Sequence, residues 1–201
     1  MSPALAEGSL DRNPIVQLRC WIAEAAGADP GEPNAMSLAT ASTDGKPAVR
    51  YVLLRGVDER GLRFYTSYFS RKARQLESNP FVAAAVYWRR LERQVLVEGE
   101  AQMLSEDESD AYFASRPRGH QLAAWASEQS EPLASRDVLE ERFAHFEERF
   151  AGQEVPRPHS WGGFAIVPQR FEFWQSRADR MHDRFEYRRD GGAWTIRRLQ
   201  P

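Results

Sequence analysis

The sequence is poor in cysteine, lysine and long apolar runs. Because Cys20 is the single cysteine, the chain can form neither an internal disulfide nor a thiolate zinc site, and one thiol is typical of a reducing compartment. No apolar run approaches the roughly 20 residues that span a bilayer. Residues 1–10 lack the basic start and apolar centre of a secretory signal. We therefore expect a cytoplasmic protein that does not bind a membrane.

The common catalytic motifs are also missing. The four histidines do not have HExxH spacing, and there is no GxGxxG, no GxxxxGK(S/T) and no GxSxG. We therefore expect no metal site, no Rossmann or P-loop nucleotide site and no hydrolase nucleophile elbow. A phosphate ligand would have to be held by side-chain cations and backbone groups.

The composition is that of one globular domain. The chain has 201 residues, 42% of them hydrophobic and 28% charged, which is enough for one substantial core and short for two domains. A formal net charge of −2 disfavours non-specific binding to nucleic acid. Residues 1–12 are small and polar, as in a flexible arm, so we expect a single domain over residues 13–201.

Strand signals dominate the chain, and the turns at residues 43–45 and 191–192 predict hairpins between the strands that flank them. Helices are expected over residues 14–26 (with Asn13 as N-cap), 71–78, 106–113, 121–126 and 136–150. Strands are expected over residues 36–42, 47–54, 62–66, 81–88, 94–104, 163–167, 170–175, 185–189 and 194–199. The continuous apolar run over residues 81–88 predicts a strand buried on both faces. This series of strands with helices between them favours an α+β, mainly β fold, a closed antiparallel barrel with helices outside.

Cations gather over residues 50–72. The stretch from Arg50 to Arg55, the turn at residues 58–61 and the run 62–66 predict a β-hairpin that leads into a helix capped by Ser70. A helix N-terminus favours an anion, and Arg71 and Lys72 add positive charge there. Lysine occurs only at Lys46 and Lys72, so a lysine retained here is informative. We interpret the stretch as a phosphate cradle; a solvated hairpin with ordinary surface arginines is the alternative.

Six further segments complete a family pattern. They are residues 92–95 (ERQV), 112–118 (YFASRPR), 124–130 (AWASEQS), 161–163 (WGG), 171–175 (FEFWQ) and 180–185 (RMHDRF), with RLQP closing the chain. Together with residues 50–72, and in this order from about Pro14 to Pro201, they resemble the pyridoxamine 5'-phosphate oxidase family. The resemblance implies a split β-barrel homodimer with FMN at each of two subunit interfaces.

The resemblance also implies a set of FMN contacts. One subunit would meet the FMN phosphate with Arg50, Arg71 and Lys72, with Ser70 and Thr66 nearby, and would line the flavin with Val52, Leu53 and Tyr65; Arg55 belongs to both the cofactor set and the substrate set. The other subunit would contribute Gln94, Gln129, Ser130, Trp174 and Arg184. Several charge-assisted donors suit a phosphate dianion. Trp174 has the alternative of a place in the barrel core.

The implied substrate is pyridoxine or pyridoxamine 5'-phosphate, oxidised at C4' with O2 as acceptor and H2O2 as product. Arg180 and His182 match the catalytic, substrate-contacting pair, and an extended strand would project both from one face. Without the family context, a salt bridge with Asp179 or Asp183 explains them. The substrate phosphate would fall to a set of four residues, Arg55, Tyr112, Arg116 and His120.

The sequence departs from the family pattern in three places. Arg55 stands where lysine is usual, His120 where serine is usual, and the amino-terminal arm lacks the basic, aromatic segment that many relatives fold over the substrate. An oxidase of the same fold with another substrate, such as a phenazine-pathway oxidase, is therefore an alternative. A non-catalytic module that binds flavin or pyridoxal phosphate is a second one.

Overall fold

One curled antiparallel sheet dominates the molecule. The computed structural model describes residues 4–28 and 31–201. Its nine strands follow the order β2-β1-β5-β6-β7-β4-β3, and β7 also pairs with β8, which pairs with β9. The bounds of the strands are β1 Ala35–Ala41, β2 Pro47–Leu53, β3 Gly56–Asp58, β4 Gly61–Ser67, β5 Phe81–Trp88, β6 Arg93–Met103, β7 Trp161–Gln175, β8 Asp183–Asp190 and β9 Ala193–Leu199.

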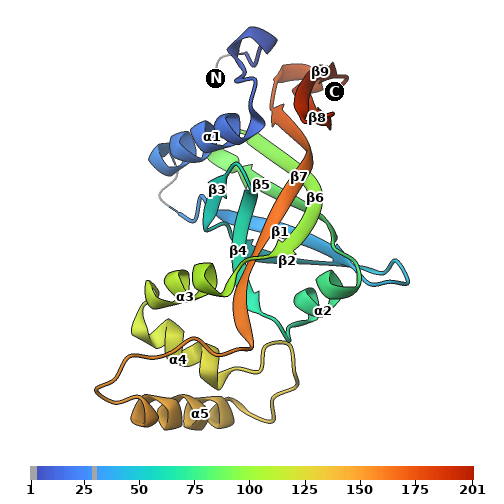
Figure 1. Cartoon of the computed structure of the whole chain (residues 1–201). Coiled ribbons are helices and arrows are strands. Elements are labelled where there is room, and N and C mark those ends of the chain that lie inside the picture. The colour runs from blue at the N-terminus through green and yellow to red at the C-terminus, as the bar shows by residue number, and fades with distance from the viewer. Residues whose placement is uncertain (1–3, 29–30) are drawn as a thin grey trace.

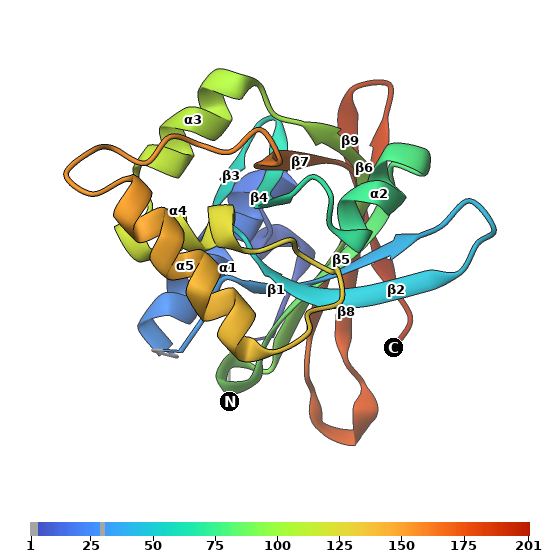
Figure 2. The ribbon, with the colours of Figure 1, turned by 90° about the horizontal axis from the view of Figure 1, so that it is seen from below.

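Helices lie outside the sheet at its two ends (Figure 1). Helix α1 lies at the end that carries the amino terminus, and α3, α4 and α5 gather at the opposite end (Figures 1 and 2). Their bounds are α1 Pro14–Ala28, α2 Arg71–Ser78, α3 Glu106–Ala114, α4 Arg118–Ala126 and α5 Arg136–Arg149, with short 3-10 turns at Glu7–Ser9, Arg89–Leu91 and Ala178–Arg180. The predicted mainly β class is confirmed. No helix in the described part of the chain is long and apolar enough to cross a membrane.

Capping side chains predicted from the sequence lie at the start of most helices. The Asn13 side chain accepts a hydrogen bond from the Ile15 N–H at 2.9 Å, and the Ser70 side chain caps α2. Ser105 and Glu108 form the predicted capping box of α3. Helix α4 begins three residues before the predicted start, because Pro117 serves as its N-cap.

The predicted hairpin between residues 50–55 and 62–66 is wrong. Strand β2 pairs with β1, where Tyr51 lies opposite Ser37, and the turn at residues 58–61 joins β4 to the short β3 instead. The tight turn before β2 contains Gly45 at φ 80° and joins β1 and β2 as a hairpin. Strands β2 and β3 stand at the two ends of the strand order and do not pair with each other. The sheet is therefore a split barrel, and the expected closed barrel is also wrong.

The core lies inside the curl of the sheet. Phe64, Phe171 and Phe173 are fully buried, and α1 closes this core with Trp21, whose ring meets Phe173 edge-on at 5.0 Å. Strand β5 corrects a second expectation, because its burial alternates and Tyr87 remains 57% exposed. All eight residues of β5 are apolar, so the run looked uniformly apolar although only one face is covered in the described chain.

A second, smaller core joins the helices to the sheet. Phe113 of α3, Leu122 of α4 and Phe150 after α5 pack around Trp161 at the start of β7. Figure 2 shows these helices to one side of the β1–β2 hairpin. This helical layer therefore faces the rim of the split barrel, where β2 and β4 end.

Candidate active site

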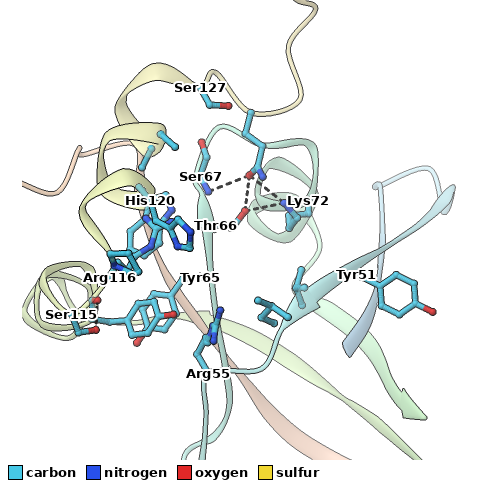
Figure 3. Close-up of a pocket in the computed structure, with 18 residues that line it drawn as sticks. Tyr51, Arg55, Tyr65, Thr66, Ser67, Lys72, Ser115, Arg116, His120 and Ser127 are labelled. Carbon is cyan, nitrogen blue, oxygen red and sulfur yellow. Dashed lines mark hydrogen bonds between the residues drawn. The ribbon is translucent and has the colours of Figure 1, made fainter. Parts of the chain in front are cut away.

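A cavity of about 790 Å³ lies at that rim, between β2, β4, the start of α2 and the α3–α4 layer. In Figure 3, Arg116 and His120 project from the helical side, and Lys72 approaches from α2 on the other side. The residues lining it are Tyr51, Val52, Leu53, Arg55, Tyr65, Thr66, Ser67, Lys72, Tyr112, Ser115, Arg116, Pro117, His120, Ala123, Ala124, Ser127, Gln129 and Trp161.

Lys72 is the centre of the first polar group in the cavity. Its Nζ donates to Thr66 Oγ1 at 2.8 Å and to Gln129 Oε1 at 3.3 Å, and only 8% of the residue is exposed. Burial, and then the nearby charge of Arg50, lower the pKa of Lys72 to about 8. Beside it, the Arg71 N–H donates to Ser130 Oγ at 3.2 Å at the N-terminus of α2.

Arg116 is the centre of a second polar group on the helical side. Its guanidinium lies over the Trp161 ring at 4.5 Å, and its Nη1 is buried with no hydrogen-bond partner among the described residues. Burial lowers the pKa of Arg116, and the positive charge of Arg55 acts in the same direction. Tyr112 stacks on Tyr65 with ring centroids 3.8 Å apart, so an aromatic wall borders this group.

None of the described residues that line the cavity is acidic. Buried cations are normally paired with carboxylates, and an unsatisfied charged donor is costly. Here the nearby charges of Arg50 and Arg55 help burial to lower the pKa values of Lys72 and Arg116, respectively. One guanidinium nitrogen of Arg116 has no acceptor among the described residues. Such a donor set fits phosphate groups, which offer several anionic acceptor oxygens. Two separate groups of donors suit two phosphates.

Two glycines shape the aromatic wall of the cavity. A Cβ on Gly163 would lie 2.7 Å from the Tyr65 ring, and a Cβ on Gly162 would lie 1.9 Å from the Tyr68 hydroxyl. Both contacts are too short for any larger residue, so the Trp161-Gly162-Gly163 segment lets β7 approach β4 closely. This places the Trp161 ring beneath Arg116.

Family comparisons agree with this geometry. Residues 22–150 match the family model described as pyridoxamine 5'-phosphate oxidase. Residues 161–201 match a second model, the pyridoxine 5'-phosphate oxidase C-terminal dimerisation region. The chain belongs to the pyridoxamine 5'-phosphate oxidase family. The family resemblance and the split-barrel fold expected from the sequence are thereby confirmed.

Relatives with this name are similar to nearly the whole chain. A pyridoxine/pyridoxamine 5'-phosphate oxidase of Rubrobacter xylanophilus is 58% identical over 98% of this chain and 91% of its own length. One of Cupriavidus taiwanensis is 50% identical over 98% of this chain and 93% of its own length. The family pattern thus extends over both the cavity and the carboxy-terminal strands.

Solved structures are similar as well. The structure of PhzG from Burkholderia lata 383, in complex with tetrahydrophenazine-1-carboxylic acid, has a TM-score of 0.93 and 34% identity, with 98% of each chain covered. An FMN-binding, pyridoxamine 5'-phosphate oxidase-related protein of Nostoc punctiforme has a TM-score of 0.73 at 20% identity over 91% of this chain and 96% of its own. The second likeness concerns the fold alone.

The structure brings most of the expected site residues to the cavity. Val52, Leu53, Arg55, Tyr65, Thr66, Lys72, Tyr112, Arg116, His120 and Gln129 line it. Ser70 borders the cavity, with its Oγ 3.4 Å from Thr66 Oγ1. Arg71 and Ser130 hydrogen-bond to one another beside it, and Arg50 donates to Thr40 Oγ1 at 2.7 Å. The expectation placed Gln129 and Ser130 on the other subunit; within the described chain, Gln129 lines the cavity and Ser130 accepts from the Arg71 N–H.

A second set of expected residues lies away from the cavity, in one row across the sheet. Gln94 of β6 is opposite Trp174 of β7, and Trp174 is opposite Arg184 of β8. Residues opposite one another in an antiparallel ladder point to the same face. Trp174 is half-buried on the face away from the Phe171 and Phe173 core, so its alternative place in the barrel core is wrong.

Arg180 and His182 lie in a turn before β8, and the expected extended strand is wrong. Arg180 ends a 3-10 turn with φ 61°, and His182 Nδ1 accepts from the Arg177 N–H at 3.1 Å. The alternative reading fails too, because in the described chain neither residue forms an ion pair with Asp179 or Asp183; Asp183 pairs with Arg177 and Arg198. No local pattern in this segment predicts the positive φ angles.

Several lining residues were missed as site residues. Trp161 forms the surface beneath Arg116, and Tyr51, Ser67, Ser115 and Ser127 also line the cavity. The Trp-Gly-Gly segment carried the signal for Trp161, because paired glycines in a strand mark close approach. The serines lie next to expected residues but have no distinctive pattern of their own.

Proposed function

We propose that the protein is an FMN-dependent oxidase that converts pyridoxine or pyridoxamine 5'-phosphate to pyridoxal 5'-phosphate. The observation that carries the proposal is the cavity with two groups of cations and no carboxylate among its described lining residues. Membership of the family, and relatives of that name that match nearly the whole chain, support the choice of reaction.

The group around Lys72 suits the FMN phosphate. Lys72, Arg50 and Arg71 supply positive charge, the N-terminus of α2 adds backbone donors, and Thr66 offers a hydroxyl at 2.8 Å from the lysine. Phosphate has a second pKa near 6 and is a dianion at neutral pH. The flavin ring would then extend along Val52, Leu53 and Tyr65 toward Arg55.

The group around Arg116 suits the phosphate of the substrate. Arg116 has a buried Nη1 without a partner among the described residues, and Tyr112, Arg55 and His120 line the same side of the cavity. Arginine binds phosphate through a bidentate fork, so Arg55 can replace a lysine here with different geometry. His120 is exposed and can donate one hydrogen bond, as a serine hydroxyl does.

A second copy of the chain would complete the site. The sheet face that carries Gln94 and Trp174 also exposes apolar side chains, with Tyr51 79% and Tyr87 57% exposed. Exposed apolar surface of this kind is typical of subunit interfaces. The match to a C-terminal dimerisation region supports a homodimer in which this row and the Arg180–His182 turn approach the partner's cavity.

The chain's own part in the reaction is to orient the substrate. Arg116 and Tyr112 would anchor the phosphate, and Arg180 and His182 of the other subunit would hold the opposite end of the pyridine ring. His182 accepts at Nδ1, which leaves its proton on Nε2 as a donor. FMN, when bound, supplies the two-electron chemistry and reaction with O2, with H2O2 as product.

Anaerobic reduction tests this function directly. We expect pyridoxine 5'-phosphate to bleach the visible absorbance of the FMN-loaded protein, and air to restore it with release of H2O2. Unphosphorylated pyridoxine at the same concentration is the control and should bleach far more slowly. Absence of bleaching by both vitamin B6 phosphates would contradict the proposal.

A phenazine-pathway oxidation is the second candidate, and the 0.93 TM-score to PhzG is the observation that favours it. Bleaching by a dihydro- or tetrahydrophenazine carboxylate, without bleaching by vitamin B6 phosphates, would select it. A non-catalytic module would bind FMN and be bleached by neither substrate.

A further inference from the structure

The turn that carries Arg180 and His182 has an unfavourable backbone. Asp179 and Arg180 have φ angles of 55° and 61°, in the left-handed region that residues with a Cβ avoid. Such residues are strained relative to ordinary conformations. A turn of this kind keeps one shape only where its surroundings hold it. The contacts that hold it are therefore of functional interest.

Asp183 holds the end of this turn through three hydrogen bonds. Its carboxylate accepts from Arg177 Nε at 2.7 Å, from Arg198 Nη1 at 2.8 Å and from the Leu5 N–H at 3.1 Å. Burial opposes ionisation, but the hydrogen bonds from Arg177 and Arg198 hold the pKa of Asp183 below its usual value. Three donors from three distant segments thus meet on one carboxylate.

Arg177 connects the carboxylate to the histidine. Its side chain holds Asp183, and its backbone N–H donates to His182 Nδ1. The His182 ring also lies 4.7 Å from the Trp174 ring. Movement of Arg177 would therefore change the orientation of the His182 ring and remove the hydrogen bond that keeps the His182 proton on Nε2.

The amino-terminal segment over residues 5–11 completes the arrangement. Leu5 and Leu10 are 7% and 8% exposed and pack into the main core. The Leu5 carbonyl accepts from Arg198 Nη2 at 3.3 Å, and the Asp11 carbonyl accepts from the Tyr187 hydroxyl at 2.8 Å. Figure 1 shows this segment beside β8 and β9, so it lies against the carboxy-terminal hairpin.

We infer that Asp183 is a positioning residue for the oxidation. It ties the segment over residues 5–11 to the Arg177–Asp183 turn, and thereby sets the orientation of Arg180 and His182 toward the substrate. The inference rests on the proposed function, since it assigns Arg180 and His182 to the substrate. It gives the amino-terminal segment of this chain a role as a brace on the turn, distinct from that of a cover over the cavity.

The test compares Asp183→Asn with Asp190→Asn, an exposed aspartate at the far end of the same strand. In FMN-saturated protein, Asp183→Asn should lower kcat/KM for pyridoxine 5'-phosphate by about 10- to 100-fold, because small misplacements of contacting groups have effects of this size. The FMN Kd should change by less than about twofold, and Asp190→Asn should behave as wild type. Asp183→Glu should recover part of the loss, because it restores a carboxylate.

Hydrogen exchange at the Arg177 amide supplies a readout without turnover. Asp183→Asn should accelerate its exchange, and so should Leu5→Pro, which removes the backbone donor to Asp183. If the wild type oxidises pyridoxine 5'-phosphate and Asp183→Asn has the same kcat/KM, the inference is overturned and the proposed function stands. An equal loss in Asp190→Asn would also overturn it. A wild type that binds FMN but oxidises no vitamin B6 phosphate would overturn the proposed function, and unaltered Arg177 exchange would reject the brace independently.

Discussion

Two arginine-rich regions of the molecule are built in opposite ways. On the outer face of β6, β7 and β8, Arg170 meets Glu98, Glu172 and Glu186 at 2.6, 2.9 and 2.6 Å. Glu172 also holds Arg184 at 2.8 Å. In the cavity, none of the described lining residues is acidic, although Lys72 and Arg116 are both largely removed from water.

The difference separates cations that hold the fold from cations that await a ligand. The hydrogen bond to Glu172 raises the pKa of Arg184, whereas burial lowers the pKa of Lys72. A cation paired with a buried carboxylate contributes to a folded network. A buried cation without one costs free energy until an anion arrives, and that cost is recovered on binding. The two regions should therefore respond oppositely to loss of charge.

The largest expected effect is on the stability of the paired region. Glu172 is 3% exposed and is shared by Arg170 and Arg184. Glu172→Gln should lower the free energy of unfolding by about 3 kcal/mol, because it removes the buried carboxylate that pairs with Arg184 and one of the three that pair with Arg170. Urea unfolding of the FMN-free protein measures this. Glu140→Gln, in an exposed pair with Arg136, should cost less than about 0.5 kcal/mol, and equal losses would refute the contrast.

Loss of charge in the cavity should act on binding. Lys72→Met should weaken FMN binding by about 10- to 100-fold, since a hydrogen bond to a charged group contributes roughly 1.5–3 kcal/mol. The FMN-free variant should be no less stable than wild type. Fluorescence titration with FMN and thermal unfolding give the two values. Lys46→Met, at an exposed pair with Asp44, is the matched control and should change neither.

Loss of the Arg116 charge should weaken substrate binding and leave FMN binding unchanged. Arg116→Gln should raise KM for pyridoxine 5'-phosphate by about tenfold, because one charge-assisted contact to the phosphate is lost. The FMN Kd should remain that of wild type. Steady-state kinetics with phosphorylated and unphosphorylated substrates provide the measurement. An equal effect on unphosphorylated pyridoxine would show that Arg116 does not face the phosphate.

The smallest expected effect is a pH dependence of FMN binding. The pKa of Lys72 is lowered to about 8 in the ligand-free protein. Below that pH the ammonium is present and binds the dianion; above it, binding must take up a proton, so affinity falls by at most about tenfold per pH unit. Stability of the free protein should rise slightly from pH 8 to 10, because the lysine is neutralised more easily when folded. Titrations from pH 7 to 9 check the slope, and Lys72→Met should abolish it.

Local chemistry made much of the fold predictable. The turns at Gly45 and at Gly191-Gly192 join the expected strand pairs, and Asn13, Ser70 and Ser105 cap the expected helices. The long-range partner of β4 could not be obtained in this way. Strand β4 pairs with β7, almost one hundred residues away in sequence, and no turn signal specifies such a partner.

A phosphate site at the cavity was predictable from residue types. Its division into a cofactor group around Lys72 and a substrate group around Arg116 was predictable only through the family. Lys72 stood out because lysine is so rare in this chain, and the helix cap at Ser70 placed it near an anion site. The row of Gln94, Trp174 and Arg184 depends on strand register, which a sequence specifies only through packing. The shape of the Arg180 turn depends on donors from residues 5 and 198, far away along the chain.

The central claim is that unpaired cations in the cavity bind the phosphate of a flavin. Titration of the flavin-free protein with FMN and with riboflavin, which lacks the phosphate, tests it most directly. We predict that FMN binds at least about 100-fold more tightly, because several charge-assisted hydrogen bonds go to the phosphate. Equal affinity for the two flavins would contradict the account.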